Sequence, residues 1–305
     1  MDRFDAMATL IAAVDGGSLS AASRALAMPL ATVSRKVSEL EAHLGTQLLV
    51  RTSRRLALTE AGEAYVAASR RILDQIDDAE RAASGEYRAP RGHLTITAPL
   101  MFGRLHVEPV VLTFLQAYPD ITVQLALADQ VINLADDHVD VALRIGELPD
   151  SSIKAIRLGA VSWVTCASPA YLQARGTPAA PEDLAHHQCI SFAGRTAAQS
   201  WSFGPDKQAR VAAIRPRLIV NTADGAINAA VAGAGITRVR SYQIAPHLAD
   251  GRLQLILRGF EPPPMPVHLV YAAQTLLPLK LRAFLDFAAP RLKASMPVLP
   301  AATPA

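Results

Sequence analysis

Residues 29–45 read PLATVSRKVSELEAHLG, and this stretch decides how the first part of the chain folds. Its apolar residues recur at the spacing of one helix face: Val33, Val37, Leu40 and Leu44. This spacing predicts an amphipathic helix with one buried side. Pro29 fits the start of such a helix, because proline is tolerated in a first helical turn.

The outward face of this helix begins with small polar side chains. Ala31, Thr32 and Ser34 are followed directly by Arg35 and Lys36. Small residues allow close approach to a DNA major groove, hydroxyl groups bond phosphates or base edges, and arginine can bridge a guanine bidentately. Taken alone, the helix fits equally well as an ordinary amphipathic helix with a solvated charged face.

Two shorter helices are expected before it. The first has an apolar face at Phe4, Met7, Ala8, Ile11 and Val14, and the Gly16-Gly17 pair ends it. Ser18 is well placed as the N-cap of a second helix over residues 19–26.

An arginine-rich turn follows the third helix. Two short apolar runs, residues 48–50 and 56–58, flank a segment that contains Arg51, Arg54 and Arg55. Residues 29–58 hold five lysine and arginine residues against two glutamates, so their net charge equals the +3 of the whole chain. Three arginines at a hairpin tip repel one another unless an anion lies nearby, so we expect a wing that grips a phosphate backbone.

The order of these segments resembles the LysR-type transcriptional regulators. The resemblance is carried by SLSAA at 18–22, ATVSRKVSELE at 31–41, LG at 44–45 and LTEAG at 58–62. It implies a winged helix-turn-helix over residues 1–59, with Thr32, Ser34 and Arg35 facing the major groove. The expected DNA-binding residues are Ser18, Ala31, Thr32, Ser34, Arg35, Lys36, Arg51, Arg54 and Arg55. Leu30 stands where many family members carry glutamine, so an amide contact to adenine is absent there.

A long helix should connect this head to the rest of the chain. Thr59 is a fitting N-cap, Glu60 and Glu63 suit the first turns, and the pattern runs to Ser84, about 35–40 Å. A seam for a partner helix is formed by Tyr65, Ala68, Ile72, Ile76, Ala79 and Ala83. The alternative is a helix lying on its own domain. The family resemblance implies that residues 60–91 form a linker helix and hinge that dimerise the chain.

From residue 92 short strands alternate with helices, which predicts a multidomain protein that ends in a largely parallel α/β module. The motifs DVALRIG at 140–146, CASPAYL at 166–172 and GAGI at 233–236 are similar to the LysR-type effector domain. That resemblance implies a two-lobed fold like the periplasmic solute-binding proteins over residues 92–290. The first lobe would hold residues 92–162 and 267–290, and the second residues 163–266. Residues 291–305 are rich in proline and alanine, and we expect them to be a disordered tail.

Ligands in open α/β sheets bind at the carboxyl ends of strands, near helix N-termini. The candidate effector-binding residues at such places are Pro99, Leu100, Met101, Phe102, Arg144, Gly146, Asn221, Thr222 and Asp224. Taken singly, each position is better explained by turn chemistry or helix capping, but together they define one candidate pocket. Family effectors are often small carboxylates, but Leu100 and Met101 replace the serine or threonine of many relatives. We therefore expect a small-molecule effector with a more apolar or aromatic character.

Other function classes find less support in the sequence. It contains no GxSxG elbow, P-loop or HExxH motif, and Cys166 and Cys189 belong to no metal-binding pattern, so we expect no enzyme, cofactor or metal. An enzyme or a transport-type binding protein on the same module, and a ligand-free adaptor, are the alternatives. With a charged N-terminus and no apolar stretch near 20 residues, we expect a cytoplasmic protein that does not contact a membrane. The resemblance implies a DNA operator as partner, a dimer that assembles into a tetramer, and an effect on RNA polymerase access when the effector closes the lobes.

Overall fold

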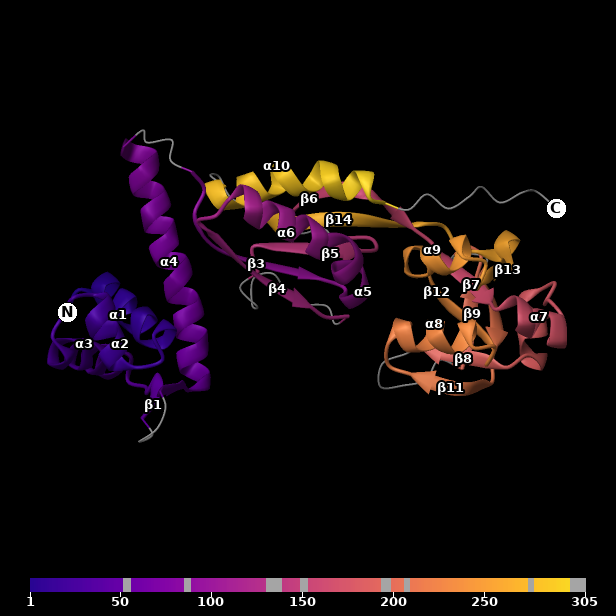
Figure 1. Cartoon of the computed structure of the whole chain (residues 1–305), viewed down its shortest axis with the longest axis horizontal. Helices are drawn as coiled ribbons and strands as arrows, with labels where there is room; N and C mark the ends of the chain where they lie inside the picture. Colours follow the sequence, from indigo (N-terminus) through magenta and orange to yellow (C-terminus); the bar gives the residue numbers. More distant parts are fainter. Residues whose placement is uncertain are drawn as a thin grey trace.

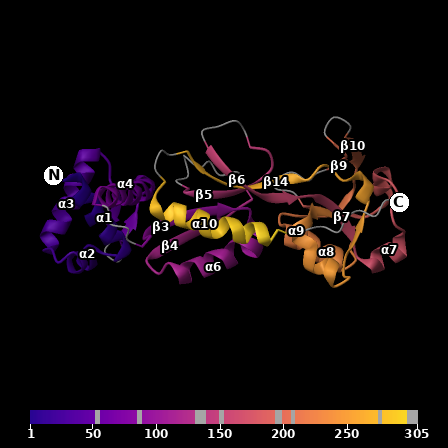
Figure 2. The ribbon, with the colours of Figure 1, turned by 90° about the horizontal axis from the view of Figure 1, so that it is seen from above.

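The computed structural model describes residues 1–51, 56–84, 89–129, 139–148, 153–192, 199–205, 209–273 and 277–296. The molecule is elongated, with an N-terminal helical head, a long helix and two α/β lobes (Figure 1). Seen from above, the head and the two lobes follow one another in a row (Figure 2).

The head consists of α1 (Arg3–Asp15), α2 (Leu19–Ala25), α3 (Leu30–Leu44) and the antiparallel strands β1 (Leu49–Arg51) and β2 (Leu56–Leu58). The predicted inward stripe of α3 is confirmed at Val33, Val37 and Leu40, which are fully buried, while Leu44 at the helix end is exposed. The expected face of α1 is partly wrong. Phe4 is exposed. The side of α1 that packs in the core of the head carries Ala6, Leu10 and Ala13 instead, and all three are fully buried.

A short turn connects α3 to the strand pair. The helix ends at Gly45, whose φ of 66° is left-handed and favours glycine. Glu41, one turn before the helix end, accepts hydrogen bonds from the backbone N–H groups of Leu48 (2.8 Å) and Leu49 (3.0 Å). Helix α3 and the start of β1 are therefore held together by the Glu41 carboxylate.

Helix α4 spans Glu60–Ser84 as the sequence predicts. The predicted cap is confirmed, because the Thr59 hydroxyl accepts a hydrogen bond from the N–H of Gly62 at 2.9 Å. The first turns of α4 lie against the head, where Val66 and Ser69 are buried, whereas Ile72 of the expected seam is 36% exposed. The helix thus packs on its own head at one end and continues beyond it (Figure 1).

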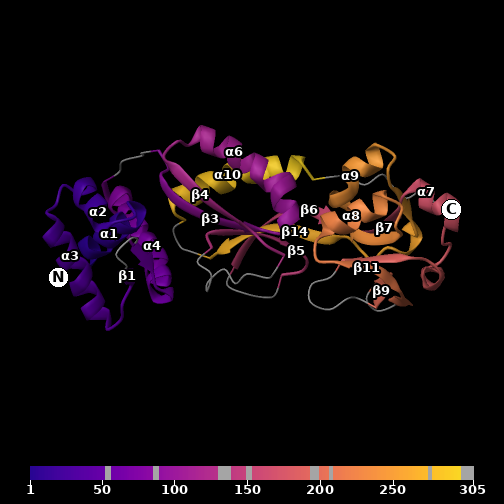
Figure 3. The same ribbon diagram turned by 60° about the horizontal axis from the view of Figure 1, so that its bottom comes forward.

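The first lobe has a sheet of strand order β4-β3-β5-β14-β6 among the described residues. Its elements are β3 (Gly92–Ala98), α5 (Leu100–Phe102), the π-helix η1 (Gly103–Val107), α6 (Glu108–Ala117), β4 (Ile121–Leu127), β5 (Val141–Ile145), β6 (Ile153–Val161), β14 (Met265–Ala272) and α10 (Leu279–Ala294). Helices α6 and α10 lie on the same side of this sheet (Figure 3).

The second lobe repeats the pattern with strand order β11-β8-β12-β7-β13. Its elements are β7 (Trp163–Ala167), α7 (Pro169–Arg175), η2 (Pro181–His186), β8 (Cys189–Phe192), β11 (Pro216–Val220), α8 (Ala223–Val231), β12 (Ile236–Arg240), α9 (Ser241–Ala249), β13 (Gln254–Ile256) and η4 (Arg258–Phe260). A separate hairpin is formed by β9 (Ser200–Phe203) and β10 (Arg210–Ala213).

The expectation of a largely parallel sheet is confirmed for both five-stranded sheets. In each, four strands run in the same direction, and one strand, β14 in the first sheet and β7 in the second, is antiparallel to both of its neighbours. The chain passes from the first sheet to the second after β6 and returns before β14. Because β14 comes back from the other lobe, it enters the first sheet against the direction of β5. The helix N–H of Ser241 donates to the Ser162 carbonyl (2.9 Å) at the first of these passages.

The head and the first lobe meet along α4. Lys280 of α10 has a nearly buried side chain that forms an ion pair with Asp74 of α4, and Arg91 pairs with Asp77 at 3.3 Å. A pocket of about 850 Å³ lies between α1, α4 and the first lobe's sheet, lined among others by Asp15, Arg70 and Asp140. The orientation of α4 relative to the first lobe is thus set by charged side chains.

No single helix among the described residues is both long and apolar enough to cross a bilayer. Only α1 and α2 taken together reach that length and composition, and they are bent by 115° at the break between them.

Replacing Gly62 by alanine tests how tightly α4 crosses the strand pair. An added Cβ would lie 2.0 Å from the Leu48 carbonyl oxygen, which is backbone and has no room to shift. We expect Gly62→Ala to lower the free energy of unfolding of the head by at least about 2 kcal/mol, measured by scanning calorimetry on the full chain. Gly259→Ala is the matched control, because a Cβ added there has no other atom within 4 Å. Equal unfolding curves for both variants would contradict this account of the packing.

Candidate nucleic-acid interface and ligand site

The outward face of α3 is open to solvent at its N-terminal half. Ala31 and Arg35 are exposed, and Thr32 and Ser34 are partly exposed beside them. The side chain of Arg35 is 68% exposed and forms a long ion pair with Glu39, one turn away at 3.8 Å. This exposed pair contributes little to stability, so Arg35 can leave Glu39 for another anion at little cost.

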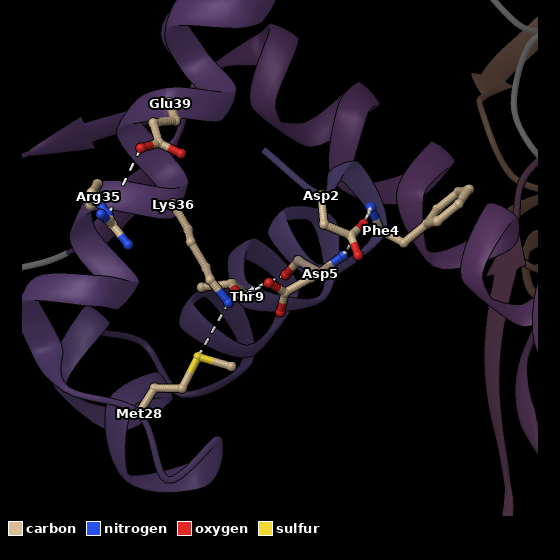
Figure 4. Close-up of polar contacts among 8 residues, drawn as sticks. All are labelled: Asp2, Phe4, Asp5, Thr9, Met28, Arg35, Lys36 and Glu39. Carbon is tan, nitrogen blue, oxygen red and sulfur yellow. Dashed lines mark hydrogen bonds and ion pairs between the residues drawn. The ribbon is translucent and has the colours of Figure 1, made fainter.

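Lys36 lies differently from its neighbour Arg35. Its side chain is only 18% exposed and points toward α1, where its Nζ forms an ion pair with Asp5 (Figure 4). The same Nζ lies 3.5 Å from the Met28 sulfur in the turn between α2 and α3. The expected DNA contact of Lys36 therefore starts, in the free protein, from a side chain engaged within the head.

The other predicted DNA-binding residues fall into two groups. Ser18 uses its hydroxyl to accept a hydrogen bond from the Ala21 N–H (3.1 Å), so it caps α2 as expected from the sequence. Arg51 is the last residue of β1, and β1 and β2 pair antiparallel as a wing would. Arg54 and Arg55 lie outside the described residues.

The two lobes touch through a cluster of side chains at α5, η1, α8 and α9. Arg104 of η1 donates to the Asp224 carboxylate of α8 at 2.7 Å, which bridges the lobes. Beside this pair, Phe102 and Tyr242 are buried with their ring centroids 5.0 Å apart in an edge-to-face arrangement, and His106 stacks against Phe102 at 4.6 Å. Burial lowers the pKa of His106, so its imidazole is neutral at pH 7.

The predicted effector-binding residues are distributed over this junction. Leu100 is exposed, but its N–H already donates to the Asp129 carboxylate at 3.1 Å, while Met101 and Phe102 are buried. Pro99 precedes α5 as its N-cap residue. These residues lie at the same junction as Asp224, because they come just before Arg104 in the chain and Arg104 bonds to Asp224 across the lobes.

The remaining predicted residues lie around this cluster or away from it. Thr222 caps α8 by accepting from the Gly225 N–H (3.2 Å), and Asn221 before it is exposed. Arg144 lies near the end of β5, opposite His268 of β14, and Gly146 follows β5 and donates its N–H to Pro266. Arg144 and Gly146 therefore belong to the return passage of the chain into the first lobe.

Sequence reasoning missed the charged and aromatic groups that join the lobes. Arg104, Asp129 and Tyr242 carry no motif, and their meeting depends on the order of the elements in space. A second group of residues that was missed could have been found from the sequence, because its two arginines alternate along one strand. Arg238 and Arg240 alternate along the buried strand β12, and both guanidinium groups lie over Trp163, at 5.5 Å and 3.8 Å from its ring. Burial lowers the pKa of each arginine to about 10.

The two cysteines are structural side chains. Cys166 packs in the core between the second sheet and α8, whereas Cys189 packs with Tyr171 and Leu184 in a separate core cluster. Burial raises the pKa of each thiol to about 12, which keeps both protonated at physiological pH. The strands between them place the thiols in different cores, and both are free.

A capped three-helix head with an exposed polar helix face, a strand pair beside it and a two-lobed α/β unit define a helix-turn-helix DNA-binding protein with a sensor module. Profiles of two protein families match the chain in the same order. The bacterial regulatory helix-turn-helix family of LysR type matches residues 4–63, and the LysR substrate binding domain matches residues 88–293.

Individual relatives cover nearly the whole chain. A HTH-type transcriptional regulator of Xanthomonas campestris pv. campestris is 33% identical over 96% of this chain and 86% of its own length. A HTH-type transcriptional repressor of Pseudomonas aeruginosa is 34% identical over 94% of this chain and 91% of its own.

Solved structures agree. CrgA, a LysR-type transcriptional regulator of Neisseria meningitidis, aligns with a TM-score of 0.60 at 32% identity, covering 94% of this chain and 98% of that one. The full-length Vibrio cholerae virulence activator AphB aligns with a TM-score of 0.59 at 28% identity, covering 94% and 98%. The chain belongs to the LysR family of transcriptional regulators, with a helix-turn-helix DNA-binding domain and an effector-binding domain.

Proposed function

We propose that this LysR-type regulator reads its operator by placing the N-terminal half of α3 in the major groove. The observation that carries the proposal is the exposed face with Ala31, Thr32, Ser34 and Arg35 on a helix whose other side is fully buried. Small residues permit close approach, and an exposed guanidinium suits a guanine edge. Arg51, Arg54 and Arg55 then hold the sugar-phosphate backbone from the wing.

We further propose that a small molecule controls DNA binding or bending from the junction of the two lobes. Arg104 and Asp224 form the bridge whose geometry changes when the lobes move. A carboxylate effector would compete with Asp129 for the Leu100 N–H, and it would meet no unpaired cation in the Arg104–Asp224 pair. An uncharged effector with an aromatic or apolar body fits these groups better.

The signal then has a route to the DNA in a homo-oligomer. The Lys280–Asp74 and Arg91–Asp77 pairs connect the first lobe to α4, so a moving lobe turns the helix that bears the head. In a dimer joined by antiparallel α4 helices, and in a tetramer built from two such dimers, this changes the spacing of the heads. RNA polymerase access changes with the DNA bend. Such a regulator works in the cytoplasm.

The DNA-reading proposal is tested by Arg35→Ala in a gel-shift assay with a duplex that the wild type selects from random-sequence DNA. We expect a loss of about 1–3 kcal/mol in binding free energy and a weaker preference for that duplex over a scrambled one. Arg252→Ala, which removes an equally charged exposed side chain in the second lobe, is the control and should bind as the wild type does. The proposal fails if Arg35→Ala keeps the wild-type sequence preference.

The ligand proposal is tested with a panel of uncharged aromatic metabolites and simple carboxylates, added to the purified chain in a thermal-unfolding assay. A ligand present at about 100 times its Kd stabilises the native state by about 2.7 kcal/mol, which raises the midpoint visibly. We expect uncharged aromatic compounds to do so, and to lose the effect in Asp224→Asn. Stabilisation by simple carboxylates alone, retained in Asp224→Asn, would contradict the assignment.

A further inference from the structure

The side chain of Lys36 lies in a different environment from the other polar side chains of α3. Arg35, its neighbour, is 68% exposed and pairs with a carboxylate 3.8 Å away, whereas Lys36 is 18% exposed and closely paired. The carboxylate that binds Lys36 belongs to Asp5, which lies on α1, 31 residues earlier in the chain. Lys36 is therefore a contact between two helices and not part of the open face (Figure 4).

The same ammonium group reaches a third element of the head. It lies 3.5 Å from the Met28 sulfur, in the turn that joins α2 to α3. That turn is itself held in place, because Ser23 donates its hydroxyl to the Met28 carbonyl at 2.6 Å and Ala27 adopts a left-handed φ of 51°. Lys36 thus joins α1, the α2–α3 turn and α3 at a single point.

The partner Asp5 is also fixed. Asp5 lies in the first turn of α1. Asp2 caps this turn, because its carboxylate accepts a hydrogen bond from the N–H of Phe4 at 2.9 Å. One turn further on, the Thr9 hydroxyl donates to the Asp5 carbonyl at 2.7 Å, and Thr9 is fully buried. A carboxylate on such a rigid turn gives a lysine a defined position, which a solvated side chain lacks.

This position bears on DNA reading because Lys36 follows directly after Ser34 and Arg35. The apolar stripe of α3 fixes which side is buried, but Val33, Val37 and Leu40 are non-directional contacts that tolerate small rotations and slides of the helix. A directional ion pair off the stripe restricts those movements. We propose that Lys36 is a positioning residue, which through Asp5 and Met28 sets the orientation of α3 and thereby the base contacts of Arg35. This inference rests on the DNA-reading function proposed above.

The opposite possibility makes a different prediction about charge. If Lys36 leaves Asp5 and binds a DNA phosphate, its removal reduces the salt dependence of binding by about one phosphate contact, a slope change of about 0.9. Removal of the Asp5 carboxylate would then free the lysine, delete a negative charge near DNA and strengthen binding. If Lys36 is a positioning residue, removing either partner weakens sequence-specific binding and leaves the salt slope unchanged.

The test compares Lys36→Met, Asp5→Asn, the double variant and the exchanged pair Asp5→Lys/Lys36→Asp in the full-length chain. The probes are a duplex that the wild type enriches from random-sequence DNA and a scrambled duplex of equal composition, titrated by fluorescence anisotropy over a series of salt concentrations. Glu39→Gln is the matched control, because it removes a carboxylate of α3 whose ion pair, with Arg35 at 3.8 Å, lies within the helix. Thermal unfolding of each variant shows that the head is folded at the assay temperature.

We expect Lys36→Met and Asp5→Asn each to bind the enriched duplex about three- to thirtyfold more weakly, with the scrambled duplex nearly unaffected. The double variant should be no weaker than either single one, and the exchanged pair should recover part of the loss. Glu39→Gln should bind at least as tightly as the wild type. Tighter binding by Asp5→Asn, together with a shallower salt slope for Lys36→Met, overturns the positioning role and makes Lys36 a phosphate contact. A wild type that enriches no sequence at all overturns the proposed DNA reading itself, and the positioning role with it.

Discussion

The buried stripe of α3 is the contact on which the functional half of the head depends. Val33, Val37 and Leu40 have no exposed surface, and burying side chains of this size is worth about 1.5–3 kcal/mol each. Because one side of the helix is buried in this way, the opposite side of α3 has to face the solvent. Thr32, Ser34 and Arg35 then have only one direction to face, which is outward. Burial by itself leaves smaller movements open, and the Lys36–Asp5 pair restricts them.

The two lobes are connected to each other and to the long helix of the head by pairs of charged side chains. The chain crosses between the two sheets twice, so the first lobe is built from two separate stretches of sequence and the second lobe is inserted between them. The lobes meet through Arg104 and Asp224, and the first lobe holds α4 through Lys280 and Asp74. Both side chains of the Arg104–Asp224 pair are exposed, so the pair contributes little to stability, which suits a contact that must change when a ligand binds. One of the two ion pairs thus lies at the junction of the lobes, and the other lies between the first lobe and α4.

The elements that depend on residues close together in the sequence were predicted correctly. The features that depend on residues far apart in the sequence were not. The caps at Ser18 and Thr59, the stripe of α3 and the length of α4 were all visible, because each depends on residues within a few turns. The antiparallel strand β14 was not recognisable as such, because its direction follows from a passage through the other lobe. The contact between Lys36 and Asp5 was not predictable for the same reason, and the DNA contact expected of Lys36 stays a prediction. Its partner Asp5 is 31 residues away, and spacing along α3 carries no trace of it.

The central claim, that α3 reads base edges in the major groove, is tested most directly by methylation protection. Dimethyl sulfate modifies guanine N7, an atom that faces the major groove, so a helix lying there shields it. On a duplex enriched by the wild-type chain, we expect guanines in each half-site to be protected by the wild type and to become reactive with Arg35→Ala. Undiminished methylation in the wild-type complex, with the DNA fully bound, would show that α3 does not occupy the major groove and would contradict the account.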